Sequence, residues 1–239
     1  MARHLLVRMH APLISFGGEA IDNLGIVRDF PALSMATGLL ANALGWDRGD
    51  FDRHNRLQAR LIMGVRLDAD GHRMVDFQTA QLQADDKGWT TRGVAEGRAG
   101  GAASYASPHL RYRHYHADMD ALVALRLKDV DESPTLDDLA DALDRPKRPL
   151  FIGRKTCLPT GRLMAGWIEA ENILSALQAA PSSLAANVRA HWPDGEGRLQ
   201  ESHDRLLDVC DERNWTSGVH GGWRPVREGL LSLTKQEVL

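Results

Sequence analysis

Hydrophobic positions divide the first 170 residues of the chain into strand-like and helix-like segments. A continuous apolar run within residues 2–10 predicts a buried strand, and a glycine-containing loop, residues 12–29, follows it. The next segment predicts a helix, because its apolar residues recur on one helical face. These residues are Leu33, Ala36, Leu40 and Leu44. Pro31 suits the first turn of this helix, and Gly45 suits its end.

Four strands are predicted in the middle of the chain. They cover residues 61–67, 74–77, 110–116 and 121–127. The first two are joined around Asp70-Gly71, a dipeptide typical of tight turns. The last two are separated by residues 117–120, which suit either a turn or a bulge in one long strand. Between the two pairs lies a glycine-rich segment, residues 83–108, and a loop this long in a compact domain usually has a function or is disordered.

A second helix and another strand complete the pattern up to residue 170. The helix opens at Ser133-Pro134, with Leu136, Leu139 and Leu143 on one side and acidic residues on the other. The strand covers residues 163–170, and a short helix after it ends at Pro181. Short strands are predicted in the weaker pattern beyond.

The order strand, helix, strand, strand, helix, strand predicts an α+β fold of the ferredoxin-like type, which RNA-recognition modules also use. We expect a ferredoxin-like domain over residues 1–175, with an inserted β-hairpin, the thumb, at about residues 79–118. Residues 176–239 form a small, mainly β C-terminal region in this prediction.

Composition narrows the class of protein. The chain has 239 residues, of which 43% are hydrophobic and 26% charged, as in ordinary globular proteins. Its formal net charge of -3 excludes a protein that is basic all over, although a local patch can still bind a polyanion. The two cysteines form no zinc or disulfide pattern. Arg8 and His10 interrupt the N-terminal apolar run, so we expect neither a signal peptide nor a membrane span, and a cytoplasmic location.

Charge is strongly segregated along the sequence. Residues 129–144 contain seven Asp or Glu and no Lys or Arg, whereas residues 145–162 contain six Lys or Arg and no acid. A second basic segment, residues 92–116, has four arginines, one acid and interleaved tyrosines. A single charged segment of this kind is explained by exposure of its side chains to solvent. Two basic segments with aromatic residues favour RNA binding, since guanidinium groups suit phosphates and aromatic rings can stack on unpaired bases.

Histidines on the polar strand offer an alternative chemistry. Alternation places Tyr112, His114 and His116 on one face of the strand, with Arg111, Arg113 and Tyr115 on the other. Histidine as general base and acid, with a cation beside it, could cleave RNA without metal. We favour a structural role over catalysis for these histidines, as hydrogen-bonded or stacked surface groups. We expect no metal, because His114 and His116 lack an identifiable third ligand.

Four motifs in order give the chain a family resemblance. The opening strand leads through Pro12 and Phe16-Gly17 into a loop, and the helix Phe30-Pro31-x-x-Ser34-x-x-x-Gly38-Leu39-Leu40 follows. Arg113-x-Tyr115-x-x-Asp118 and Gly153-Arg154-Lys155-Thr156-Cys157 come later. Together they resemble the CasD-type subunits of type I-E CRISPR surveillance complexes (Cascade), members of the RAMP superfamily. The chain departs from the family at Gly25, where the family often places an arginine; Arg28 is the nearest substitute.

The resemblance implies a non-catalytic subunit without a cofactor, which grips the 5′ handle of the CRISPR RNA and caps the backbone of the complex. Its implied partners are the CRISPR RNA, the large subunit and the first backbone subunit, with target DNA reached indirectly and no membrane. The expected RNA contacts are Arg28, Arg92, Arg98, Arg111, Arg113, Tyr115, Arg154 and Lys155. Two alternatives remain open. One is a metal-independent endoribonuclease that processes precursor CRISPR RNA, with Tyr112, His114, His116 and Lys155 as candidates; the other is an interaction module without an RNA role.

Overall fold

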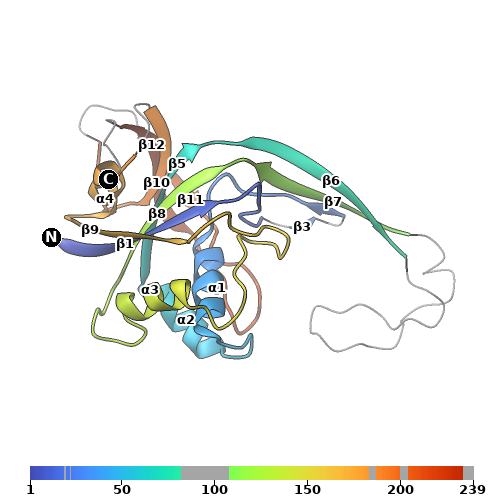
Figure 1. Ribbon diagram of the computed structural model, residues 1–239, viewed down its shortest axis with the longest axis horizontal. Coiled ribbons are helices and arrows are strands. Elements are labelled where there is room, and N and C mark those ends of the chain that lie inside the picture. The colour runs from blue at the N-terminus through green and yellow to red at the C-terminus, as the bar shows by residue number, and fades with distance from the viewer. Residues whose placement is uncertain (19, 22, 82–107, 183–186, 200–203, 234–239) are drawn as a thin grey trace.

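The computed structural model describes residues 1–18, 20–21, 23–81, 108–182, 187–199 and 204–233 (Figure 1). The helices are α1 (Leu33–Leu44), α2 (Phe51–Arg60), α3 (Leu136–Asp144) and α4 (Ile173–Ala179). The strands are β1 (Ala2–His10), β2 (Leu13–Ile14), β3 (Ala20–Ile21), β4 (Leu24–Gly25), β5 (Leu61–Ala69), β6 (His72–Ala80), β7 (His109–Ala117), β8 (Asp120–Leu127), β9 (Met164–Ala170), β10 (Asn187–Pro193), β11 (Arg205–Val209) and β12 (Arg224–Ser232).

The main sheet confirms the predicted α+β fold. Its strand order is β11-β12-β10-β5-β8-β1-β9, and the pairs within it are antiparallel. If β1, β5, β8 and β9 are numbered 1 to 4 in chain order, their order across the sheet is 4-1-3-2. This is the strand order of a ferredoxin-like sheet. Strand β1 alternates between two cores. Leu5 and Val7 face the layer formed by α1, α2 and α3, whereas Leu6 faces α4 on the other side.

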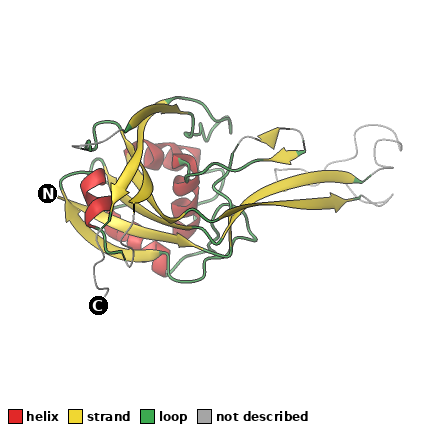
Figure 2. Cartoon of the chain, turned by 90° about the horizontal axis from the view of Figure 1, so that it is seen from above, coloured by secondary structure: helices red, strands yellow, loops and turns green. Residues whose placement is uncertain are grey.

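Two long strands leave this sheet and form a ribbon. Strand β5 pairs with β8, and its continuation β6 pairs with β7 in a second sheet, so the ribbon arches away from the body (Figures 1 and 2). The expected tight turn at Asp70-Gly71 is therefore wrong, because β5 and β6 pair with other strands rather than with each other. Gly71 bends one strand at φ +64°, and Asp118, at φ 55°, bends the other. The segment 117–120 is thus a bend within one long strand.

Helix α1 begins and ends by different means. Gly45 ends it in the left-handed conformation, φ +81°, as predicted. The helix begins at Leu33, two residues after Pro31, and its N-cap residue makes no side-chain cap. Asp211 of the C-terminal segment supplies the missing acceptors: Leu33 N–H donates to Asp211 Oδ2 at 2.9 Å and Ser34 N–H donates to the Asp211 carbonyl at 3.0 Å.

The C-terminal strands extend the main sheet. Ala190 and His191 of β10 pair with Arg66 and Val65 of β5, and β12 and β11 follow outward. A division of the chain at residue 175 stays a prediction.

Helix α3 has a capping box built by Thr135 and Asp138, two residues after the predicted opening. Among the described residues, no helix is long and apolar enough to cross a membrane. Strand β7 and the last residues of β6 fall within the predicted thumb, most of β6 precedes it, and residues 82–107 lie outside the described part.

Candidate nucleic-acid interface

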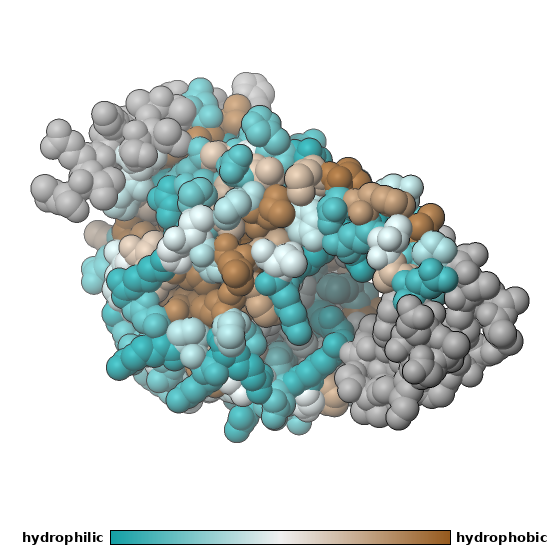
Figure 3. Space-filling model, turned by 45° about the vertical axis from the view of Figure 1, so that its right-hand side comes forward, coloured by the Kyte–Doolittle hydropathy of each residue, from teal (hydrophilic) through white to brown (hydrophobic). Residues whose placement is uncertain are grey.

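The β6–β7 ribbon has two chemically different faces. Directly paired residues of antiparallel strands share a face. Phe77 pairs with Tyr112 on one face, with their ring centroids 5.1 Å apart, and both rings are exposed. On the other face Arg113 pairs with Asp76. The predicted alternation is confirmed, and apolar surface is visible along the ribbon in the space-filling view (Figure 3).

Two guanidinium groups meet where the ribbon joins the body, over Gly25. Gly25 of β4 pairs in parallel with Arg113 of β7. A Cβ atom at Gly25 would lie 2.9 Å from Arg113 Nη1 and 3.1 Å from Arg154 Nη2. Arg154 also donates hydrogen bonds to the carbonyls of His114 (2.8 Å) and Gly25 (3.0 Å). The absent side chain at Gly25 therefore leaves the space that these two cations occupy.

A tight turn presents Arg154 and Lys155. Gly153 adopts φ +89°, and a Cβ atom there would lie 1.5 Å from the Ser15 carbonyl oxygen, so only glycine fits. The turn is closed by Cys157 N–H, which donates to the Arg154 carbonyl at 2.8 Å. Cys157 is buried, and burial raises the pKa of its thiol. Lys155 is exposed and has no hydrogen-bonding or ionic partner within the part of the chain that the structure describes.

Three predicted residues lie beside this turn in supporting positions. The Arg154 guanidinium lies 4.7 Å from the ring centroid of Tyr115, which is buried. His116 is also buried, with Nε2 2.9 Å from the Arg28 carbonyl oxygen, and burial lowers the pKa of its imidazole. The Arg28 side chain donates to the Cys210 carbonyl at 2.8 Å. The ring of Tyr115 thus supports a cation, and that of His116 supports the backbone of the loop.

A hollow of about 330 Å³ opens next to the turn. Backbone at Gly17, Gly18 and Gly153 and the small α1 residues Ser34 and Gly38 line one part of it. Its other wall comes from the C-terminal segment: Arg213, Trp215 and His220. Trp215 Nε1 donates to Gln58 Oε1 at 3.2 Å, which fixes the indole. A volume of this size suits a single nucleobase between an aromatic side chain and glycine backbone.

The structure brings together four of the eight predicted contacts: Arg28, Arg113, Tyr115 and Arg154, with Lys155 following in the same turn. Arg111 stands farther out on the ribbon, and its Nη1 donates to the Leu110 carbonyl at 2.8 Å. Arg92 and Arg98 lie outside the described residues. Sequence reasoning missed Arg213, Trp215 and His220, which follow no periodic pattern. The described residues contain no cluster of three or more His, Cys, Asp or Glu side chains that could hold a metal ion.

The fold and this surface define a ferredoxin-like α+β protein with a long ribbon and with a basic turn that borders a hollow. The chain belongs to the CRISPR-associated protein (Cas_Cas5) family, whose model matches residues 4–227. A chain from a structure described as a CRISPR RNA-guided surveillance complex is 22% identical with a TM-score of 0.68, over 96% of this chain and 90% of that one. A second, described as a Cas protein, is 26% identical with a TM-score of 0.61, over 96% and 95%. A comparison of the chain with curated proteins found no match.

Proposed function

We propose that the chain is a non-catalytic, CRISPR RNA-binding subunit of a surveillance complex, of the CasD type found in type I-E Cascade. It grips the 5′ handle of the guide RNA and caps one end of the backbone. Its protein neighbours are the large subunit and the first backbone subunit, and it reaches target DNA only through the complex. This role is cytoplasmic. Family membership and the likeness to a surveillance-complex chain support the assignment.

One observation carries the proposal: cations from separate segments lie at the glycine turn and in the hollow that Gly153 of this turn lines. Arg113 comes from the ribbon, and Arg154 and Lys155 come from the glycine turn. Arg28 and Arg213 line the hollow beside Trp215. Cations that flank an aromatic pocket suit a single-stranded RNA with one base turned away from its neighbours.

The position of His116 supports a non-catalytic role. Its ring is 2% exposed, and Nε2 is engaged by the Arg28 carbonyl, so it cannot deliver or accept a proton at a bound RNA without rearrangement. The endoribonuclease alternative then depends on Tyr112 and His114 of the ribbon and on Lys155.

The test is binding of labelled repeat RNA and of the isolated 5′ handle to the purified chain, without metal, across a salt series. We expect salt-dependent binding without cleavage. Lys155→Ala should weaken binding, lower the log–log salt slope by about 0.7 and leave stability unchanged, since Lys155 has no partner among the described residues. Lys128→Ala, which removes another exposed lysine, is the matched control and should leave the slope unchanged.

Arg154→Ala should lower both RNA affinity and stability, because Arg154 also holds two backbone carbonyls. If the double change of Arg154 and Lys155 to Ala leaves handle binding intact, the assignment of this surface is wrong. Cleavage of repeat RNA at one position, abolished by His114→Ala, would instead make the chain a processing nuclease.

A further inference from the structure

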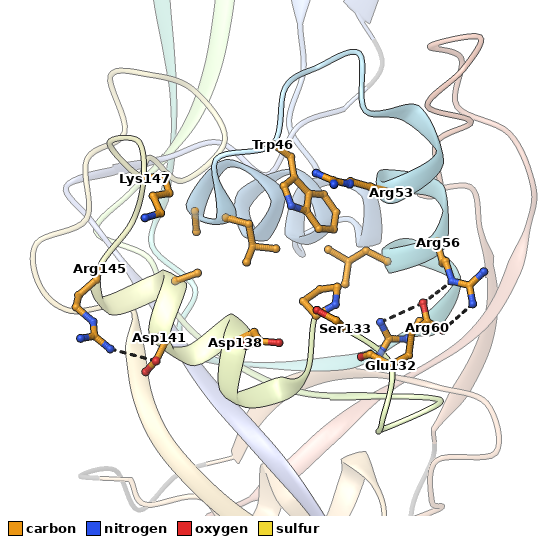
Figure 4. Close-up of a pocket in the computed structure, with 15 residues that line it drawn as sticks. Trp46, Arg53, Arg56, Arg60, Glu132, Ser133, Asp138, Asp141, Arg145 and Lys147 are labelled. Carbon is orange, nitrogen blue, oxygen red and sulfur yellow. Dashed lines mark hydrogen bonds and ion pairs between the residues drawn. The ribbon is translucent and has the colours of Figure 1, made fainter.

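A second hollow lies on the helical layer, away from the ribbon. It encloses about 760 Å³ between the C-terminal end of α1, helix α2 and helix α3 (Figure 4). Its aliphatic lining comes from Ala43, Leu44, Leu57, Pro134 and Ala142. It shares no lining residue with the hollow beside Trp215. Nothing in the proposed grip on RNA uses it.

The charged side chains around this hollow do not balance. Five cations and three carboxylates line it: Arg53, Arg56, Arg60, Arg145 and Lys147 against Glu132, Asp138 and Asp141. Glu132 is shared by Arg56 and Arg60, and Asp141 pairs with Arg145 at 3.1 Å. Asp138 accepts the Thr135 N–H in the capping box. Arg53 and Lys147 are left without a carboxylate partner within the described residues.

These two cations flank a fixed indole. Trp46 points into the opening between Arg53 and Lys147, across from Asp138 and Asp141 (Figure 4). The Arg53 guanidinium lies 5.8 Å from the centroid of the Trp46 ring. His54 packs against the indole edge-on at 5.7 Å, and Arg148 holds the Trp46 carbonyl at 2.6 Å. The ring is therefore held in place before any ligand binds.

We propose that this hollow docks an acidic segment of a neighbouring polypeptide, which inserts one large apolar side chain against Leu44, Leu57 and Trp46. Two carboxylates of that segment pair with Arg53 and Lys147. The aliphatic lining suits an apolar anchor, as in grooves that bind amphipathic helices. A run of phosphates would meet the carboxylates of Glu132, Asp138 and Asp141 with only two unpaired cations to offset them. The observations therefore favour a protein over a nucleic acid.

The probe is a fluorescent, capped peptide of about 14 residues built from Glu, Ala and Leu with one central Phe, and its twin carries Gln at every Glu position. Anisotropy is measured on the full chain. We expect the Glu peptide to bind about tenfold more tightly than the Gln twin, and Arg53→Glu or Lys147→Glu to remove most of that difference. Arg198→Glu, an exposed arginine elsewhere on the surface, is the matched control and should change nothing. Thermal melts exclude misfolding of the variants.

Three results overturn the proposal. The first is no binding of the Glu peptide at concentrations up to about 1 mM. The second is equal binding by the wild type and both charge-reversed variants. The third is loss of handle RNA binding in the Arg53 and Lys147 variants as large as in Lys155→Ala, which would assign the hollow to the RNA path. Peptide binding that depends on the hollow in a chain that binds no RNA would refute the proposed function alone.

Discussion

Gly153 is the residue whose replacement tests the construction of the basic turn most directly. Its φ of +89° is disfavoured for any residue with a side chain, and a Cβ atom would lie 1.5 Å from the Ser15 carbonyl oxygen. Both colliding atoms are fixed to the backbone, so no side-chain rotation relieves the overlap. In Gly153→Ala the turn must therefore move away from Ser15.

The size of the effect follows from what this movement breaks. The left-handed backbone costs alanine about 1–2 kcal/mol. Separation of the segments also removes the hydrogen bond from Ser15 N–H to the Ile152 carbonyl (3.2 Å) and strains that from Ile152 N–H to the Cys157 carbonyl (2.8 Å). Each such bond contributes about 1 kcal/mol. We expect a loss of about 3–4 kcal/mol, which for a chain of this size lowers Tm by about 6–16 °C.

Two other glycines separate the contributions in a thermal or urea denaturation series. Gly17 has φ +76° but nothing within 4 Å of an added Cβ atom, so Gly17→Ala should show the backbone cost of about 1–2 kcal/mol alone. Gly161 lies in the same basic segment with an open Cβ position and no positive φ, and Gly161→Ala should stay within about 0.5 kcal/mol of the wild type. If Gly153→Ala is no less stable than Gly17→Ala, the close approach to Ser15 does not hold the turn, and the reasoning is refuted.

Three further predictions concern the rest of the molecule. Arg66→Met should destabilise the chain by about 3–5 kcal/mol in urea, because the fully buried guanidinium holds carbonyls at the end of α4 and its loss leaves the buried Asp68 carboxylate with only the Arg8 guanidinium, 3.9 Å away. Asp68→Asn in that background should restore part of the loss, and no restoration would contradict the pairing. Asp211→Ala should cost about 2 kcal/mol, because it removes the acceptor of Leu33 N–H at the start of α1 and the carboxylate that pairs with Arg224; an unchanged melting curve would contradict these roles. Burial lowers the pKa of His191 from 6.5 to about 4, so the unfolded chain binds more protons than the folded chain in that pH range. Stability should therefore fall by about 3 kcal/mol as pH falls from 6.5 to 4. His191→Phe should flatten this part of the pH profile, and an equal slope in both proteins would refute the assignment.

Much of the fold follows from local patterns. The buried faces of β1 and β8, the left-handed stop at Gly45 and the apolar stripe of α3 are each visible in a short stretch of sequence. The ferredoxin-like order then follows from the sequence of elements. Asp70-Gly71 shows where such reasoning fails, because a dipeptide that permits positive φ serves a hairpin and a bend in a long strand equally well. Which of the two forms is decided by the pairing partners, β8 and β7, far along the chain.

The candidate site was predictable only where one segment carries the signal. Gly153, Arg154 and Lys155 are adjacent, and the chemistry of a glycine turn bearing two cations is readable from the sequence. The role of Gly25 is not, because it consists of leaving room for arginines from two other elements. Trp215 reaches the hollow from a C-terminal segment whose residues follow neither helical nor strand periodicity.

Helix α2 was missed for a physical reason that bears on both proposals. The helix buries polar side chains, among them His54 and Gln58, so it lacks an apolar stripe. Gln58 instead binds Arg213 N–H and the Trp215 indole. His54 lies between two tryptophans, edge-on to Trp46 at 5.7 Å between ring centroids and tilted against Trp215 at 4.5 Å. One of these rings lines the hollow assigned to RNA and the other lines the hollow assigned to an acidic segment. Since His54 packs against both indoles, α2 contacts the walls of both hollows, and a displacement of His54 would reach Trp46 and Trp215 together.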